Sequence, residues 1–125
     1  MRKLYIASAI SALLLSSLMF ATPSRAAECI IAGELSPWGT NSTGTFMLPS
    51  GGSCVLNLRI PGVVNSSSVL QKPAHGSLRR VNVSNYEYRA GKGFKGTDTF
   101  SVTAVGKTAA GMTGKSVVTL NANIQ

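Results

Sequence analysis

The chain has 125 residues, with 12 Lys or Arg, 4 Asp or Glu, one His and two Cys, and its formal net charge is +8. This length allows one domain and excludes a large multidomain enzyme. One histidine and four carboxylates leave little material for acid–base or metal chemistry.

The first 26 residues have the features of a secretory signal peptide. Arg2 and Lys3 precede an apolar stretch, and Ser24-Arg25-Ala26 places small residues at the two positions that a signal peptidase reads. The stretch is short and serine-rich for a retained membrane span, and Glu28 before Cys29 does not fit a lipoprotein signal. We therefore expect cleavage after Ala26, a secreted or periplasmic location, and membrane contact only through this transient segment.

Cleavage leaves residues 27–125 as one small domain. Three of the twelve basic residues leave with the signal, so nine remain against four acidic ones, a net charge of +5. Cys29 and Cys54 both remain, and an exported domain meets an oxidising compartment. The chain has no Cys-x-x-Cys motif and no histidine near either cysteine. We therefore predict a structural disulfide between them rather than a redox or metal site.

Alternation of apolar and polar residues with a period of two dominates the domain. It predicts half-buried strands over residues 53–60, 67–72, 77–83, 86–89, 99–105 and 116–124. Clusters of Gly, Pro, Ser and Asn separate them, at 49–52, 61–62, 73–76, 85, 91–96 and 106–114. About seven short strands with such turns predict an all-β fold, an antiparallel β-sandwich.

Residues 72–105 carry a recognisable pattern. They read Lys-Pro-Ala-His-Gly-Ser-Leu, then Tyr-Glu-Tyr-Arg-Ala, then Gly-Phe-Lys-Gly-Thr-Asp-Thr-Phe-Ser-Val. This segment resembles the bacterial Ig-like, cadherin-like domain that occurs in tandem arrays of exported surface proteins. The residues that match its pattern are Pro73, Gly76, Tyr86, Tyr88, Phe94, Gly96, Asp98 and Phe100. The resemblance implies an Ig-like sandwich associated with the cell surface or envelope.

The matching residues also have physical roles that do not depend on the family. Phe94 can plug the bottom of the core from a loop, and Phe100 enters the core from the strand that follows. Gly96 permits a backbone turn that other residues resist. Asp98 can accept backbone N–H groups and fix the loop where the strand begins. We therefore interpret this motif as structural.

The chain departs from relatives of that family in two ways. Both cysteines lie in its first half, so we expect a link from the N-terminal strand to its neighbour and not the long inter-sheet bridge of antibody domains. Cadherins bind calcium through clustered carboxylates, whereas the four acidic residues here are scattered. We expect no metal site and no cofactor.

His75 is the one candidate for an acid–base role. A catalytic histidine needs a nucleophile and an orienting acid, and no Gly-x-Ser-x-Gly motif is present. We interpret His75 as a solvent-facing turn residue and name no catalytic residue.

The basic residues are the strongest functional lead. Six of them lie within one short stretch: Lys72, Arg79, Arg80, Arg89, Lys92 and Lys95. A surface of one sign attracts polyanions, and in an exported protein these are an anionic polysaccharide, lipopolysaccharide phosphate or an acidic protein. A net charge of +5 that serves only solubility is the alternative. We expect no nucleic-acid partner in a secretory compartment.

The sequence analysis therefore predicts an exported, monomeric, non-enzymatic binding or structural module. The open edges of a sandwich also allow a partner protein to dock by strand pairing. A pilus-type subunit that assembles by strand donation is the alternative, although Cys29 is expected to hold the N-terminal arm. A small secreted hydrolase is a third class, for which the chain offers few candidate residues.

Overall fold

The computed structural model describes residues 27–33 and 37–125, and all regular structure in them is β-strand. The prediction of an all-β chain is therefore confirmed. The expected signal peptide, residues 1–26, lies outside the described residues. Within the described ranges there is no helix with the length and hydropathy needed to cross a membrane.

Eight strands follow one another in the described part of the chain, where about seven were predicted. They are β1 (Ala32–Gly33), β2 (Ser42–Leu48), β3 (Ser53–Asn57), β4 (Val63–Gln71), β5 (Gly76–Arg80), β6 (Asn85–Ala90), β7 (Gly96–Lys107) and β8 (Thr113–Ile124).

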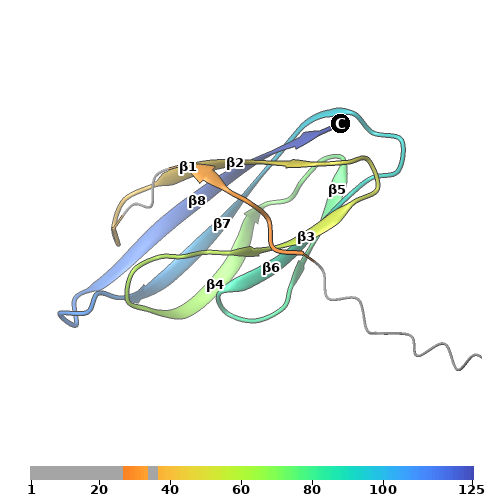
Figure 1. The fold of residues 1–125 in the computed structure, drawn as a ribbon. Coiled ribbons are helices and arrows are strands. Elements are labelled where there is room, and N and C mark those ends of the chain that lie inside the picture. The colour runs from red at the N-terminus through yellow and green to blue at the C-terminus, as the bar shows by residue number, and fades with distance from the viewer. Residues whose placement is uncertain (1–26, 34–36) are drawn as a thin grey trace, which may run out of the picture.

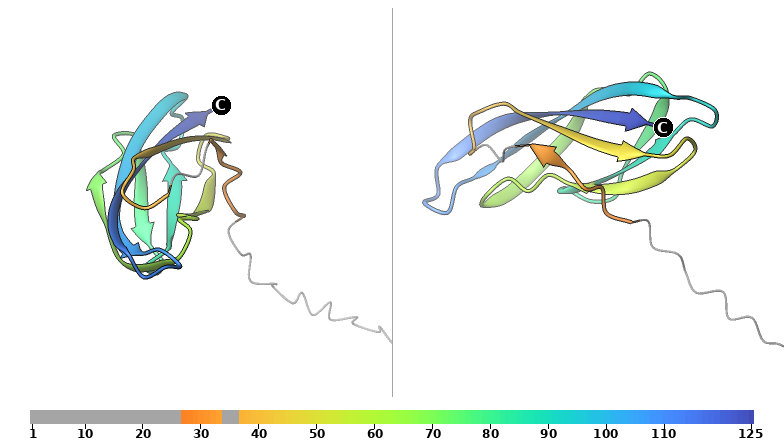
Figure 2. Two further views of the ribbon diagram at one scale, coloured as in Figure 1. Left: turned by 90° about the vertical axis from the view of Figure 1, so that its left-hand side faces the viewer. Right: turned by 45° about the horizontal axis from the view of Figure 1, so that its top comes forward.

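The strands form two layers that face each other (Figures 1 and 2). One sheet has the order β1-β2-β8-β7-β4 and the other has the order β3-β6-β5. The chain passes between layers after β2, β3, β4 and β6, and consecutive strands pair directly only at β1–β2, β5–β6 and β7–β8. Most pairing therefore joins residues that are far apart in the sequence.

One strand pair shows that the wholly antiparallel prediction is wrong. β2 pairs with β8 in parallel, in a register that joins Ser42 to Val118 and Leu48 to Ile124. The two strands are separated by nearly the whole domain, so no tight turn forces them to run in opposite directions. The other strand pairs are antiparallel.

The core lies where the apolar faces of the two sheets meet, as the alternation predicted. Tyr86 and Tyr88 are fully buried from the three-stranded side, and Phe100 is fully buried from the five-stranded side. The rings of Tyr88 and Phe100 stack at 5.2 Å, and Phe46 from β2 meets both rings edge-on. These aromatic contacts join the two layers.

β2 was not predicted, and its sequence explains why. Its inward positions carry Ser42 and Gly44 before the first large apolar residue, Phe46, so the alternation is weak. Gly44 is needed where it lies, because a Cβ there would come 2.6 Å from the side chain of Ile31. The small residues of β2 thus make room for the N-terminal segment that crosses it.

Two predicted strands end three residues earlier in the structure. β5 ends at Arg80 rather than at residue 83, because residues 81–84 form the turn that precedes β6. Asn82 closes this turn, since its side-chain oxygen accepts the N–H groups of Ser84 and Asn85. β3 ends at Asn57, although Leu58 and Ile60 continue its buried face.

β4 is the outer strand of the five-stranded sheet, and it begins four residues earlier than predicted. Its pairing with β7 shifts register twice, so that Asn65 and Leu70 are each an extra residue on β4. Leu70 is 62% exposed. Such bulges hinder edge-to-edge pairing with another chain, as edge strands of natural proteins commonly do.

The N-terminal segment, residues 27–33, bridges the two sheets along one side. Val55 of β3 exchanges backbone hydrogen bonds with Ala27 and Cys29, and the segment then pairs with β2 through β1. The predicted disulfide is confirmed: Cys29 is bonded to Cys54 of β3. The link from the N-terminal strand to its neighbour is therefore also as expected.

Candidate functional site

Three loops meet at one end of the sandwich, and most of the predicted site residues lie on them. They are the turns at residues 49–52, 72–75 and 91–95, which we call together the lysine end. The Gly91 N–H donates to the His75 carbonyl at 3.0 Å, and the Ala90 N–H donates to the Gly52 carbonyl at 2.9 Å. In Figure 1 the cyan loop after β6 marks this end, beside the end of β8. The opposite end, at the β7–β8 turn, we call the hairpin end.

A buried carboxylate beneath the lysine end holds the turn at residues 73–76. Asp98 is 1% exposed, and its oxygens accept the Ala74 N–H at 2.9 Å, the His75 N–H at 3.2 and 3.3 Å, and the Tyr88 hydroxyl at 2.7 Å. Asp98 therefore fixes a loop by accepting backbone N–H groups, but this loop is the one that precedes β5. The sequence did not indicate which loop would supply the donors.

The electrostatic effect of this arrangement is clearest at Tyr88. Burial, the hydrogen bond to Asp98 and the nearby carboxylate charge together raise the pKa of the Tyr88 hydroxyl well above its ordinary value of 10.0. Tyr88 therefore remains a neutral hydrogen-bond donor to the carboxylate, as a structural anchor requires.

The two glycines of the motif serve different needs. Gly76 has no room for a side chain, because a Cβ there would come 2.5 Å from the Arg89 carbonyl oxygen and 2.7 Å from the Tyr88 hydroxyl. Gly96 has a φ of +131°, a conformation that side chains disfavour. Pro73 is partly buried at the start of the same turn. These positions shape the lysine end without offering reactive groups.

His75 and Phe94 form the exposed aromatic feature of the lysine end. Their rings stack with centroids 4.0 Å apart and an interplanar angle of 4°. His75 is exposed, whereas Phe94 is half-buried and packs against the core. Phe94 thus does contact the core from a loop, but it also supports a histidine ring, which the sequence did not indicate.

The structure divides the six basic residues into separate groups. Lys72, Lys92 and Lys95 are exposed on neighbouring loops of the lysine end. Arg89 is exposed on β6, one residue before the hydrogen bond from Ala90 to Gly52.

The other two arginines do not belong to the lysine end. Arg79 forms a salt bridge of 3.3 Å with Glu87 on the outer face of the three-stranded sheet. Arg80 is the last residue of β5, at the end of that strand away from the lysine end, and its side chain points to the opposite face from that of Arg79. The structure therefore brings four of the six residues to one region.

The outer faces of the two sheets differ in charge. Across β7 and β8 the outward positions near the lysine end carry hydroxyl and amide side chains, including Thr99, which donates to Asn121, and Thr97, which donates to Asn123. The outer face of the three-stranded sheet carries Arg79, Glu87 and Arg89 instead. Near the lysine end, charge is therefore concentrated on the three-stranded layer and the loops.

Few side chains in the part of the chain that the structure describes are placed to bind a metal ion or to act as an acid or base. No group of three or more His, Cys, Asp or Glu there is placed to hold a metal ion. Asp98 is occupied by backbone and tyrosine donors, and the His75 ring lies against Phe94.

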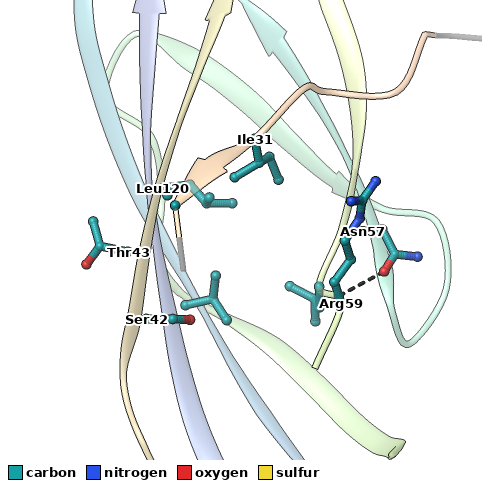
Figure 3. Close-up of a pocket in the computed structure, with 10 residues that line it drawn as sticks. Ile31, Ser42, Thr43, Asn57, Arg59 and Leu120 are labelled. Carbon is teal, nitrogen blue, oxygen red and sulfur yellow. Dashed lines mark hydrogen bonds between the residues drawn. The ribbon is translucent and has the colours of Figure 1, made fainter. Parts of the chain in front are cut away.

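A small pocket opens between the layers, on the side crossed by the N-terminal segment. Its volume is about 160 Å³, and its walls include Ile31, Ser42, Leu58, Arg59, Val118 and Leu120 (Figure 3). We call it the Arg59 pocket. Sequence analysis did not identify it, because its walls come from β1, β2, β8 and the end of β3.

Arg59 has an unusual backbone at the rim of this pocket. Its φ is +38°, the one positive value at a non-glycine position in the described ranges. The Asn57 side chain holds the bend, because its oxygen accepts the Arg59 N–H at 2.8 Å while its amide donates to Asn85 at 2.9 Å. A residue held in this region costs roughly 1–3 kcal/mol, and such strain is concentrated at functional sites.

A second, larger hollow of about 480 Å³ lies on the same side, between the N-terminal segment and β2. Ile30 beside it is 91% exposed and Met47 is 61% exposed. Among the described residues β1 pairs with β2 only at Gly44 and Thr45, which leaves the last part of β2 open on that side. This edge is a surface at which another strand has room to pair.

Comparisons with known proteins add little to this geometry. No family model matches the chain, and no curated protein matches it. Among solved structures, a sialyltransferase from Photobacterium damsela is similar at 16% identity with a TM-score of 0.42, over 68% of this chain. The similar region is 18% of the sialyltransferase chain, and a likeness this low carries no argument about fold or function.

Proposed function

We propose that the chain is an exported, non-enzymatic Ig-like module of the bacterial envelope or cell surface, which binds an anionic glycan through its lysine end. The disulfide between Cys29 and Cys54 supports export, because such bonds persist in non-reducing compartments. The signal peptide expected over residues 1–26 supports it independently.

The strand order supports the Ig-like part of the proposal. Counting from β2, the second, fifth and fourth strands form one sheet, and the third, sixth and seventh lie together in the other. Immunoglobulin-type sandwiches divide their strands in this way. In this chain β2, the first in that count, pairs with the last strand.

The observation that carries the binding proposal is the position of Lys72, Lys92 and Lys95. They lie on loops that hydrogen bonds connect, above a turn that a buried carboxylate fixes, beside the exposed ring of His75. Loops on a rigid scaffold are common binding surfaces. Several exposed lysines on neighbouring loops suit a polymer with repeated anionic groups.

The test compares two triple variants that remove equal charge. Lys72→Gln/Lys92→Gln/Lys95→Gln alters the lysine end, and Arg80→Gln/Lys107→Gln/Lys115→Gln alters residues away from it. Lys107 lies roughly 36 Å along β7 from Gly96, and Arg80 lies about 13 Å along β5 from Gly76. On a sulfated-polysaccharide column we expect the first variant to elute at clearly lower salt and the second to elute near wild type. Equal shifts in both variants would contradict a local site and leave net charge alone as the explanation.

Docking of a partner protein by strand pairing is the second function that an observation favours. The open part of β2 near Met47 provides an edge for it. Strand donation of the pilus type has less support, because β8 lies between β2 and β7 of its own chain and the N-terminal segment is bonded to β3. Light scattering across protein concentrations distinguishes the two, since only strand-donating assembly makes long oligomers of this chain alone.

A further inference from the structure

The Arg59 pocket gives access to core side chains that are otherwise covered. Leu58, Val118 and Leu120 are at most 9% exposed, yet they line it together with Ile31. Its volume of about 160 Å³ is close to that of an engineered apolar cavity that accepts benzene, about 150 Å³. The pocket therefore has room for an apolar group of roughly six carbon atoms.

The pocket exists because β2 presents small residues where the core has room for large ones. In the parallel register Ser42 lies beside Val118 and Gly44 beside Leu120. Ile31 fills the space over Gly44, but among the described residues no large side chain covers the space beside Ser42. The hydroxyl group of Ser42 is turned toward this space in Figure 3.

The rim of the pocket carries a positive charge on a backbone that hydrogen bonds hold in place. Arg59 lies across the hollow from Ser42 (Figure 3), and it is the one charged residue that lines the pocket in the described ranges. The salt bridge found among the described residues, Arg79–Glu87, does not involve it. The chain of hydrogen bonds from Arg59 through Asn57 to Asn85 holds the backbone from which the guanidinium extends.

We propose that the Arg59 pocket binds a small amphiphilic carboxylate, such as a short acyl chain. The apolar tail would lie against Ile31, Leu58, Val118 and Leu120. The carboxylate would meet the Arg59 guanidinium at the rim. An uncharged apolar molecule contacts only the apolar walls of this site. An anion without a tail contacts only the polar group at its rim.

The test uses hexanoate as the probe and hexan-1-ol as the uncharged control. In amide NMR spectra of the mature protein we expect saturable shifts at Gly33, Gly44, Asn57 and Arg59 with hexanoate. We expect Arg59→Gln to weaken hexanoate binding by about three- to fivefold, as suits an exposed ion pair, and to leave hexan-1-ol binding unchanged. The Lys115→Gln variant, at the hairpin end, controls for loss of charge.

A second variant fills the pocket. Ser42→Leu should abolish binding of both probes and raise the melting temperature, because the added side chain covers exposed core atoms. Its higher melting temperature shows that the variant folds, so loss of binding reports the pocket itself. Shifts that do not saturate, hexanoate binding that Arg59→Gln leaves unchanged, or binding that survives Ser42→Leu would each overturn the proposal. None of these outcomes bears on the lysine end, which contributes no residue to the pocket.

Discussion

At the scale of single residues, Asp98 shows why the motif serves architecture. A carboxylate that is 1% exposed is tolerable only when it is hydrogen-bonded, and its donors here are two backbone N–H groups and one tyrosine hydroxyl. These bonds connect three elements: the turn before β5, strand β6 and strand β7. Asp98 therefore determines the position of the turn that presents His75 and Lys72.

Replacing Asp98 by Asn should destabilise the protein by about 2–4 kcal/mol. The amide keeps the shape of the carboxylate, but its NH2 group faces donors, and the bonds lose their charge assistance. Chemical denaturation measures the loss. Glu87→Gln is the matched control, because it removes the carboxylate of the exposed Arg79 salt bridge and should cost under about 1 kcal/mol. Equal costs for the two variants would show that Asp98 has no special structural role.

The raised pKa of Tyr88 predicts a specific response to alkaline pH. In the unfolded chain Tyr88 releases its proton near pH 10.0, whereas the folded protein retains it to higher pH. The contribution to the free energy of unfolding is therefore complete below pH 10.0 and declines as pH rises above it, by up to about 1.4 kcal/mol per pH unit.

Tyr88→Phe isolates this effect, because it removes the titrating group. The stability difference between wild type and variant should stay constant from neutral pH to about pH 10 and then narrow. Denaturation of wild type and variant at each pH tests this expectation. The measurements are kept brief so that the disulfide stays intact at alkaline pH. A difference that is constant across the alkaline range would show that the Tyr88 proton is not held by the fold.

At the scale of elements, the N-terminal segment depends on its attachment to β3. β1 contributes only two residues to a sheet, and the segment crosses from one layer to the other. The disulfide closes a span of 25 residues, which on the chain-entropy model contributes about 3–4 kcal/mol.

Cys29→Ala/Cys54→Ala should therefore lower the free energy of unfolding by about 3–4 kcal/mol. It should also increase hydrogen exchange at the backbone amides of position 29 and Val55, whose hydrogen bonds hold the segment. Exchange at Tyr88, in the middle of β6, serves as the reference for global stability. If exchange rises equally at all three positions, the segment is not a separately attached element.

At the scale of the whole molecule, the two ends and the two faces of the sandwich have different properties. The lysine end combines charge with a fixed turn, whereas the hairpin end lies farther along β7 and carries Lys107 and Lys115. The side crossed by the N-terminal segment carries both hollows. The glycan proposal and the carboxylate proposal therefore concern separate regions and can succeed or fail independently.

The sequence by itself determined the class of fold and the content of the core. Period-two alternation places Tyr86, Tyr88, Phe100 and Val102 on buried faces whichever strands lie beside them, because side chains alternate between the two faces of any strand. Two cysteines permit one pairing, so the disulfide also followed from the sequence.

Tertiary structure alone decided which strands pair and which loops meet. The parallel partner of β2 and the donors to Asp98 depend on contacts between distant segments, for which local alternation carries no signal. The same applies to the separation of Arg80 from Lys92, because sequence spacing does not reveal to which end of a strand a loop belongs. The Arg59 pocket depends on the same contacts between distant segments, because it is the space left between strands after they have packed.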